Sequence, residues 1–596
     1  MAPAASLEGG ENGLGVVAEL RAAGLERRGW LAMVIAPGVG CGFAIANEPQ
    51  PDRERACVAR YTNDPVALVA LIEQTFQPRW VWWSRQTAMQ LVAAGVRVAR
   101  CWDVDAVHRL LFGGWQAGCA LVWATLQCLD GGSMPTMGQL DLLSDGNIDD
   151  GDVDEPVRPD GHLRPEWVVG GWAADSDRMA RWAALAATSC HLQRQRLSER
   201  APSLGGEPTG TARAESAAEL LCAELMFDGL PLDVDHAAQL IGSYIGPRPA
   251  NETEIATCRQ QRDRRVLDHL DGAGSVDLRN PTHVRAMLRR VGVDVPNTRA
   301  WRLEPLRDVH PVVDALLAWR KAERIATTYG YGWLDEHVGA DGRLRGEWTG
   351  SDGAAGRMTA QAGLHNMPAE LRGAVSAEPG HVLVRADLGQ IEPRVLAAVS
   401  GDDALMRATM ADDLYAPIAT RLGVERAIAK VAVLAAMYGQ TSGTAGQALR
   451  GLDAAYPVAM RYLRDAEDAG RAGRDVRTHG GRLVRMGADP DATDPNRERA
   501  ALAARGRYAR NAVVQGAAAE LFKAWAVTVR ARLAPFDARI VLCLHDELLI
   551  HAPVEHGAAV AELVDDCLHD AARRWSAGRP VRFVTSTSII ARWSDA

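Results

Sequence analysis

The spacing of hydrophobic positions changes along the chain and divides it into segments. Over residues 15–197, short apolar runs such as Leu31–Ile35 and Trp80–Trp83 alternate with helix-like stretches, which predicts a mixed α/β domain. Residues 198–212 are rich in Gly and Pro and predict a linker. Over residues 215–335 apolar residues recur at helical spacing, so a helical segment is expected there.

Two β-like segments carry acids where a strand should end. The run His381–Asp387 ends in a carboxylate, and in 539–553 two apolar runs flank His545–Glu547, a pattern typical of a hairpin with charges at its turn. A carboxylate at the tip of a strand is held rigidly, as a metal ligand must be. The structural alternatives are a helix N-cap for Asp387 and a turn residue for Asp546.

Taken together, Asp387 and Asp546 suggest a two-metal site. Mg²⁺ takes a few carboxylates plus substrate phosphates, so two Asp suffice. Two ions ~3.5–4 Å apart would activate an attacking hydroxyl and stabilise the leaving oxygens.

A third segment places four side chains on one face of a helix. Arg426, Lys430, Leu434 and Tyr438 are each four residues apart, and Gly439 is a suitable C-cap. This stripe offers two cations for phosphates, an apolar patch for a base and an aromatic ring. The alternative is an amphipathic helix with exposed cations, but the chain has few lysines and one of them lies in the stripe.

Composition excludes several classes of protein. The 596 residues, 47% hydrophobic and 24% charged, are typical of a globular chain of several domains. There is no apolar run of ~18 residues, so we expect no membrane span. The N-terminus lacks a basic segment typical of a signal peptide, so none is expected. The absence of a C-x-x-C pair argues against a zinc ribbon and for a protein of the reducing cytosol.

The net charge of −9 conceals local basic segments. An acidic stretch over 141–160, predicted to be a surface loop, accounts for most of it. Two Arg-rich runs, 471–485 and 497–510, are candidates for phosphate binding, although a basic run is more often a solvated face.

The three chemical segments resemble motifs A, B and C of family A DNA polymerases, the group of bacterial DNA polymerase I. The segment that resembles motif A is Asp387-Leu-Gly-Gln390-Ile-Glu392-Pro-Arg394. The segment that resembles motif B is Arg426-x3-Lys430-x3-Leu434-x3-Tyr438, and the one that resembles motif C is His545-Asp546-Glu547. Further matches follow the family's order: Gly356-Arg357, Leu371-Arg372, Thr478 with Gly481-Arg482, and Arg507-x3-Asn511-x3-Gln515. The resemblance covers about 215–596 and is strongest to the compact actinobacterial branch of bifunctional 3′–5′ exonuclease/DNA polymerases.

This resemblance implies an α+β multidomain fold. A right-hand polymerase, with an antiparallel palm sheet and helical fingers and thumb, would follow an α/β exonuclease-like (RNase H-like) domain. The expected division is a flexible tail over 1–14, the exonuclease-like domain over 15–197, a linker over 198–212, the thumb over 213–345, the palm over 346–400 and 501–596, and the fingers over 401–500.

The resemblance also implies a role for each matching residue. Asp387 and Asp546 would bind metal with Glu547 beside them, and Lys430 would grip the triphosphate and protonate the leaving pyrophosphate. The other implied nucleotide-binding residues are Arg426, Leu434, Tyr438, Gln390 and Glu392, the last excluding a ribose 2′-OH. The implied DNA-binding residues are Arg357, Arg372, Arg482, Arg507, Asn511, Gln515 and His545.

The implied function is template-directed addition of dNTPs to a primer 3′-OH in DNA replication and repair. The implied cofactor is two Mg²⁺ ions, with Mn²⁺ as a substitute, and the partners are primer-template DNA and dNTPs. The protein is expected to be a monomer, cytoplasmic and nucleoid-associated. The alternatives are a non-catalytic DNA-binding protein on this scaffold, an RNA polymerase, which Glu392 disfavours, and a polymerase with an active exonuclease.

Two departures from the family pattern concern selectivity and proofreading. Leu388-Gly389 and Leu434 replace positions that are usually aromatic or Ser, without removing a metal ligand. In the N-terminal domain, the first acidic pair of an exonuclease is missing near Leu31–Ile35, Ser176 falls where a metal Asp belongs, and Asp103 and Asp105 remain as remnants of the middle motif. We therefore expect a degenerate domain without proofreading.

Overall fold

The computed structural model describes residues 8–47, 57–61, 64–137, 152–270, 276–439, 445–487 and 494–595. These residues form two compact units. The first comprises Met1–Phe227, Trp348–Thr359 and Val384–Ile589, and the second Asp228–Glu347, Ala360–Leu383 and Ile590–Ala596. Of the predicted acidic loop, residues 141–151 lie outside the described residues, as do residues 1–7 of the predicted tail.

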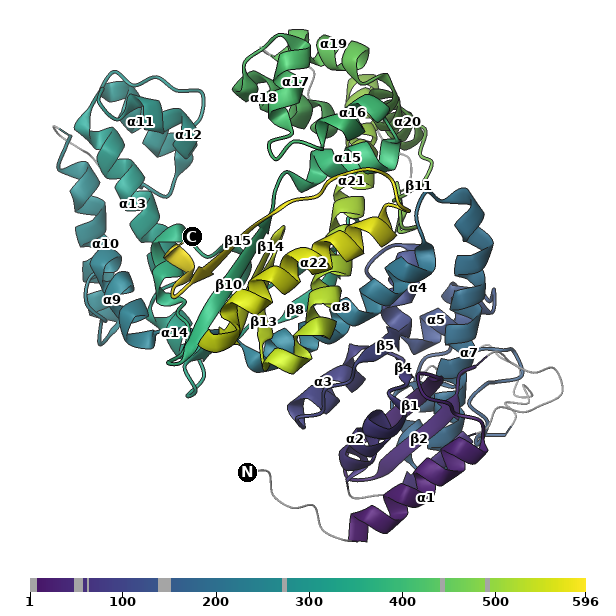
Figure 1. Ribbon diagram of the computed structural model, residues 1–596. Coiled ribbons are helices and arrows are strands. Elements are labelled where there is room, and N and C mark those ends of the chain that lie inside the picture. The colour runs from purple at the N-terminus through teal and green to yellow at the C-terminus, as the bar shows by residue number, and fades with distance from the viewer. Residues whose placement is uncertain are drawn as a thin grey trace. The chain divides into compact units, whose positions relative to one another are not determined.

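The N-terminal part of the first unit contains a five-stranded sheet in the order β3-β2-β1-β4-β5 (Figure 1). The strands are β1 (Trp30–Ala36), β2 (Gly40–Ile45), β3 (Cys57–Tyr61), β4 (Arg79–Trp82) and β5 (Arg100–Asp103). The β1–β2 and β2–β3 pairs are antiparallel, whereas β1–β4 and β4–β5 are parallel. The mixed α/β fold predicted for this part of the chain is therefore confirmed.

Both faces of this sheet are buried, which explains why its strands read as continuous apolar runs. Leu31, Met33 and Ile35 of β1 lie in one core cluster, and Ala32 and Val34 lie in the other. The first cluster includes residues of α1 (Glu8–Ala22), α2 (Pro65–Phe76) and α3 (Arg85–Ala93). The second includes residues of α4 (Val104–Phe112), α5 (Cys119–Leu126), α6 (Pro165–Val168) and α7 (Ser176–Arg200).

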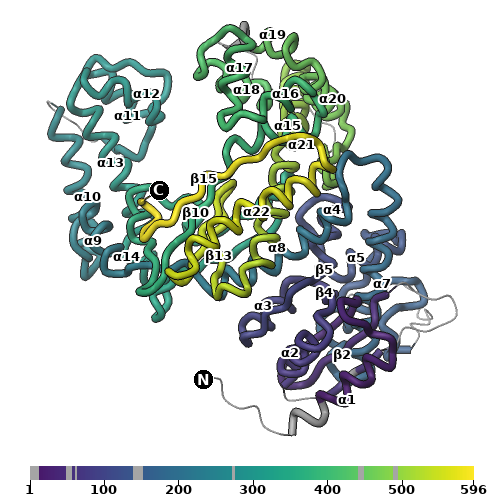
Figure 2. Tube along the Cα trace, viewed as in Figure 1, coloured from purple at the N-terminus to yellow at the C-terminus, as the bar shows by residue number. Residues whose placement is uncertain are grey.

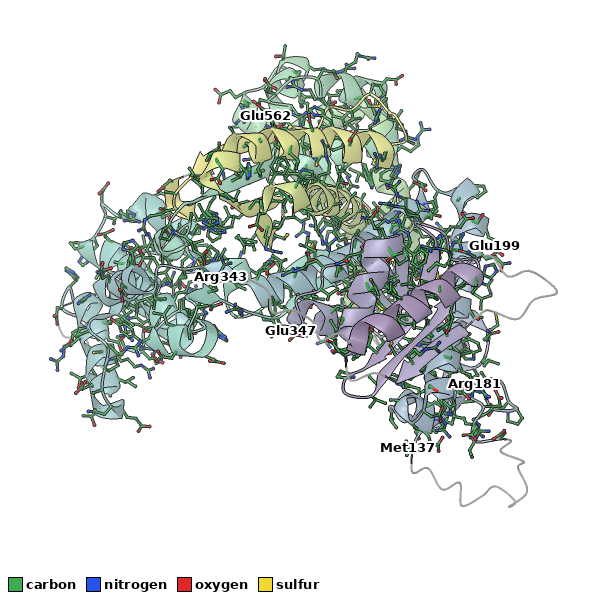
Figure 3. The ribbon with its side chains drawn as sticks, turned by 60° about the horizontal axis from the view of Figure 1, so that its bottom comes forward. Met137, Arg181, Glu199, Arg343, Glu347 and Glu562 are labelled. Carbon is green, nitrogen blue, oxygen red and sulfur yellow. The ribbon has the colours of Figure 1, made fainter. Side chains whose placement is uncertain are left out.

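Tryptophan packing fills the core beneath α7. The ring of Trp182 lies 5.1 Å from that of Trp83 and 6.2 Å from that of Trp167. The next residue towards the N-terminus, Arg181, is exposed and pairs with Glu155 at 2.7 Å (Figure 3). The two neighbours on α7 thus differ completely in burial.

Two segments predicted to be irregular are partly helical. Helix α1 begins at Glu8, inside the predicted tail, because Val16, Val17 and Leu20 supply a buried face at helical spacing. Within the predicted linker, α7 continues to Arg200 and α8 (Pro208–Asp228) begins at a proline. Pro favours the first turn of a helix, so its presence marked a start rather than a loop.

A second sheet of the first unit has the strand order β13-β14-β10-β15. The strands are β10 (His381–Leu388), β13 (Arg539–Leu544), β14 (Glu547–Pro553) and β15 (Thr585–Ile590). The first three residues of β10 and the last residue of β15 belong to the second unit. The predicted strand over 381–387 and the predicted antiparallel hairpin over 539–553 are confirmed. The long helices α21 (Pro495–Leu533) and α22 (Gly557–Trp575) pack together beside this sheet (Figure 2).

Helices dominate the segment between β10 and α21. They are α15 (Ile391–Ser400), α16 (Asp403–Ala408), α17 (Tyr415–Leu422), α18 (Arg426–Tyr438), α19 (Ala445–Ala455) and α20 (Pro457–Arg471). Two short strand pairs complete this unit: β8 (Trp348–Asp352) with β9 (Arg357–Ala360), and β11 (Val476–Arg477) with β12 (Leu483–Val484).

The second unit is mainly helical. Its helices are α9 (Val234–Ile245), α10 (Glu252–Leu267), α11 (Pro281–Arg290), α12 (Ala300–Leu303), α13 (Pro311–Thr328) and α14 (Tyr331–His337), joined by the short strands β6 (Leu230–Pro231) and β7 (Arg343–Leu344). Val284, Leu288, Leu316 and Trp319 are among its buried core. Among the described residues of the whole chain, no helix combines the length and apolar character that a membrane crossing requires.

Truncating the buried tryptophan of α7 tests the core of the N-terminal sheet. Trp182→Ala is expected to lower the free energy of unfolding of this part by about 3–5 kcal/mol, because it removes a large ring from a packed cluster. Arg181→Ala, the exposed neighbour, should change it by no more than about 0.5 kcal/mol. Urea unfolding followed by far-UV circular dichroism measures both, and equal effects would contradict the packing described above.

Candidate active site

The predicted acids meet where β10 ends and the β13–β14 hairpin turns. Leu388 donates its backbone N–H to the carbonyl oxygen of Asp546 at 2.9 Å, which brings Asp387 next to that turn. Leu544 pairs with Glu547, so His545 and Asp546 form a two-residue turn. His545 adopts a left-handed φ of 46°, as the first position of a tight hairpin turn can require.

The acids perturb one another. Burial, followed by the charge of Asp546, raises the pKa of Asp387 to about 6. Burial also raises the pKa of Asp546, and Glu547 adds to that effect. Carboxylates whose pKa values rise through burial and mutual repulsion form a site that favours cations.

Arg385 is a residue that sequence reasoning missed. Its guanidinium donates to Glu547 Oε2 at 2.8 Å and lies 3.5 Å from Asp387 Oδ2. It partly neutralises the cluster, and the acids in turn raise the pKa of Arg385 although burial opposes this. The available signal was its position two residues before Asp387 on a strand, which places both side chains on one face.

A pocket of about 270 Å³ lies beside the acids. Within it, Glu392 accepts hydrogen bonds from Arg357 Nη2 and from the hydroxyl of Tyr438, each at 3.0 Å. Burial and the charge of Glu392 raise the pKa of Tyr438. The predicted residues that line the pocket are Arg357, Gln390, Glu392, Leu434, Tyr438, His545 and Asp546.

Helix α18 carries the predicted stripe on the face that is not packed. Arg426 and Lys430 are exposed, whereas Leu434 and Tyr438 are half-buried and line the pocket. The opposite face is made of small residues that pack inwards, and Gly439 ends the helix in a left-handed conformation (φ 65°). The stripe thus runs from solvent into the pocket, as its spacing predicted.

Gln390 and Arg426 share a partner, Asp413. Gln390 donates to Asp413 Oδ1 at 2.9 Å, and Arg426 forms an ion pair with the same carboxylate. The amide oxygen of Gln390 also accepts the backbone N–H of Leu414 at 2.9 Å. In this conformation both residues tie the loop before α17 to the neighbouring helices.

Arg394 is a second residue whose role the sequence did not reveal. Its side chain is fully buried, and it donates to backbone carbonyls of Gly389, Thr409, Ala411, Asp412 and Arg582. The Gln390-Ile-Glu392-Pro-Arg394 spacing marked it as part of motif A. Its function here is to hold the segment after Asp387 against two other segments, 409–412 and the one that contains Arg582.

The other predicted DNA-binding residues have different surroundings. Arg507, Asn511 and Gln515 lie four residues apart along α21, with Arg507 exposed and the other two half-exposed. Arg372 belongs to the second unit, where its guanidinium lies 4.2 Å from the ring centroid of Trp593.

Arg482 requires a correction. It is only 3% exposed and forms an ion pair with Glu215, and its Nη1 donates to Ser351 Oγ at 2.9 Å. A buried guanidinium that is already paired is not presented to a phosphate. These surroundings do not provide the direct DNA contact predicted for Arg482.

Two arginines of the first basic run, the half-buried Arg477 and the exposed Arg485, bind the end of α4. Arg477 donates to the carbonyl of Leu111 at 3.1 Å, and Arg485 donates to that of Phe112 at 2.8 Å. These carbonyls lie in the last turn of α4, where cations are favourable. Phosphate binding by Arg477 and Arg485 is therefore not supported.

Two of the acids of the N-terminal domain, Asp103 and Asp175, cap helices. Asp103 caps α4 through the N–H of Ala106 and accepts a hydrogen bond from Trp82, and Asp175 caps α7. Burial raises the pKa of Asp103 to about 8 and that of Asp105 to about 6. Strand β1 contributes only apolar side chains to the core.

Replacing Asp387 by Asn should stabilise the metal-free protein. The folded-state pKa of Asp387 lies above its unfolded value, so the ionised carboxylate costs stability above pH 6 and this cost fades as the pH falls through 6. Because the side chain is partly exposed, we expect a gain of about 1 kcal/mol at pH 7.5. Urea unfolding at pH 7.5 and pH 5 measures it, and a gain that grows towards pH 5 would contradict this assignment.

Comparison with known proteins places these features in a family. The model of DNA polymerase family A matches residues 283–595, which is more than half of the chain. The chain is 32% identical over 296 residues to DNA polymerase I of Chloroflexus aurantiacus, covering 45% of this chain and 31% of that protein. It is 31% identical over 300 residues to the thermostable DNA polymerase I of Thermus aquaticus, covering 46% of this chain and 36% of that protein.

The chain thus spans about a third of the length of the curated relatives it matches. A solved structure of the POL domain of Pol1 from M. smegmatis, in complex with DNA primer-template and dNTP, has a similar fold, with a TM-score of 0.66 and 20% identity. The alignment covers 97% of this chain and 98% of that chain. The family match over more than half of the sequence, together with the arrangement of the three motifs, shows that the chain belongs to DNA polymerase family A.

Proposed function

We propose that this protein is a template-directed DNA polymerase that adds dNTPs to a primer 3′-OH. The observation that carries the proposal is the meeting of Asp387 with Asp546 and Glu547 beside the pocket that Glu392, Tyr438 and Leu434 line. An apolar wall, an aromatic ring and a carboxylate cluster suit a nucleotide with its metal-bound phosphates.

The donor set of the site suits magnesium. Asp387 and Asp546 would hold two Mg²⁺ ions, with Mn²⁺ as a substitute, because both ions prefer oxygen ligands. Arg385 already engages Glu547, so Glu547 is an auxiliary acid rather than a main ligand. When bound, the two ions would activate the primer hydroxyl and stabilise the leaving oxygens.

The chain's own residues would position the substrates. Arg426 and Lys430, on the exposed end of α18, would hold the triphosphate, and Lys430 would protonate the leaving pyrophosphate. Glu392, half-buried and fixed by Arg357 and Tyr438, would fill the space that a ribose 2′-OH needs. Leu434 and Tyr438 would face the incoming and templating bases.

The duplex would lie along the α21 residues. Arg507, Asn511 and Gln515, with Arg357 and His545, would contact the minor groove, where acceptors are common to all base pairs and sequence is not read. In this assignment residues 346–400 and 501–596 are the palm, 401–500 the fingers and 213–345 the thumb. Arg372, which lies within 346–400, would contact DNA from the palm.

We also propose that proofreading is absent. The acids left in the N-terminal sheet cap helices or lie buried, and β1 supplies no carboxylate. Two-metal hydrolysis needs a group of acids around one point. The protein would act as a monomer in the cytoplasm, on nucleoid DNA.

Primer extension tests this function directly. With Mg²⁺ and dNTPs the wild type should extend a primed template, and Asp387→Ala should reduce the rate at least about 10³-fold because a metal ligand is lost. Glu562→Ala, which removes an exposed acid from α22, should leave the rate within about twofold.

Two outcomes would overturn parts of the proposal. Binding of primed DNA without extension by the wild type would favour a non-catalytic DNA-binding protein. Shortening of the primer in a reaction without dNTPs would show an active exonuclease.

Glu392 should control the choice of sugar. Glu392→Ala opens space beside the sugar and is expected to raise the ratio of rNTP to dNTP incorporation by roughly tenfold. Glu392→Gln keeps the volume and loses only the charge, so it should change the ratio much less. Single-nucleotide incorporation rates measure both variants, and equal relaxation by both would show that charge rather than volume excludes the ribose.

A further inference from the structure

Lys523 lies beneath the β8–β9 hairpin of the first unit. It is fully buried on α21, and its Nζ donates to the carbonyls of Gly350 at 3.3 Å and of Gly356 at 2.8 Å. Its counter-ion is Glu215 of α8. One buried cation thus holds β8 and the end of the turn before β9, in a hairpin whose two strands form a sheet by themselves.

Glu215 holds a second cation against the same hairpin. Arg482 pairs with Glu215 and donates to Ser351 Oγ at 2.9 Å. Gly356 has a left-handed φ of 66°, and a Cβ at this position would lie 2.4 Å from the guanidinium of Arg482. Burial alone would raise the pKa of Glu215, but Arg482 and Lys523 lower it, which favours the ionised carboxylate.

The position of this hairpin determines where Arg357 lies. Arg357 directly follows Gly356 and begins β9. Its guanidinium reaches Glu392 at 3.0 Å in the pocket of the candidate active site. A shift of the hairpin would therefore move a residue that lines the nucleotide pocket.

The N-terminal sheet reaches the same hairpin through Arg85. This residue, the first of α3, donates to the carbonyl of Trp348 at the start of β8 and pairs with Glu219 of α8 at 3.3 Å. Arg109 of α4 pairs with Glu219 at 2.7 Å. Glu219 in turn lies against Gly350, where an added Cβ would come within 2.9 Å of it.

We propose that Lys523 and Arg85 are positioning residues for Arg357, and that the N-terminal domain supports the polymerase site through the β8–β9 hairpin. This inference rests on the proposed function. By this inference, the N-terminal domain has a structural role in the polymerase, because Arg85 of α3 and Arg109 of α4 hold Glu219, which lies against the hairpin.

The chain contains a matched control for Lys523. Arg530 is also a cation of α21 with little exposure, 11%, and pairs with Glu224 of α8 at 2.6 Å, but it donates to the carbonyls of Val98 and Ala99 and not to the hairpin. Lys523→Met is expected to lower the rate of nucleotide addition about tenfold, because small displacements of positioned groups reduce rates steeply. Arg530→Met should stay within about twofold.

Coupling to Arg357 separates positioning from general destabilisation. If Lys523 acts through Arg357, the Arg357→Ala/Lys523→Met double variant should be no slower than Arg357→Ala alone. Multiplied losses in the double variant, or equal losses in Lys523→Met and Arg530→Met, would overturn the proposal.

Arg85 provides a second test that does not create a fully buried unpaired charge. Arg85 and Arg97 have similarly exposed side chains, 22% and 26%, and each pairs with a glutamate of α8, but Arg97 pairs with Glu224 and lies over Phe227. Arg85→Ala should slow addition by about threefold. An equal effect of Arg97→Ala would overturn the proposed link to the hairpin.

Hydrogen exchange gives a readout that does not depend on activity. Amides of residues 348–359 should exchange faster in Lys523→Met and Arg85→Ala than in wild type. Their exchange rates in Arg530→Met and Arg97→Ala should equal those of wild type. Unchanged exchange in the first two variants would overturn the inference. If the wild type did not extend primers but the variants showed these exchange rates, the proposed function would be wrong. The proposal that Lys523 and Arg85 hold the hairpin in place would remain valid.

Discussion

The backbone hydrogen bond from Leu388 to Asp546 holds acids together that repel one another. Burial and mutual repulsion raise the pKa values of Asp387 and Asp546, so the fold carries an energetic cost at neutral pH. Rigid strands can bear this cost because backbone pairing and buried apolar residues of β13 and β14 fix their positions. Such repulsion is typical of a site that favours cations, and the other residues of the candidate active site are arranged around it.

Arginine has two distinct uses in this protein. Arg394, Arg482 and Arg477 satisfy carbonyls or a buried carboxylate, where the planar five-donor guanidinium is well suited. Other cations, such as Lys430 and Arg507, are exposed at the surface. Runs of basic residues in this sequence therefore do not map directly onto a surface that binds nucleic acid.

The fold of the N-terminal sheet does not depend on a cluster of acids. Its core depends on apolar strands and packed tryptophans, which need no acid. The carboxylates that remain serve as helix caps, and Glu219 of α8 receives Arg85 and Arg109 from its helices. A domain held in this way can serve the polymerase site through position alone.

Local sequence determined a large part of this picture. Short apolar runs located β10 and the β13–β14 hairpin, and helical spacing located α18. Fixed spacings placed Arg426, Lys430, Leu434 and Tyr438 on one helix face, because such features depend on neighbours in the chain. The pairing of Arg482 with Glu215, the role of Arg385 and the helical start of α1 depended on distant segments. Only the tertiary structure decided them, since whether a charge is solvated or buried depends on what packs against it, and no spacing along the chain records that.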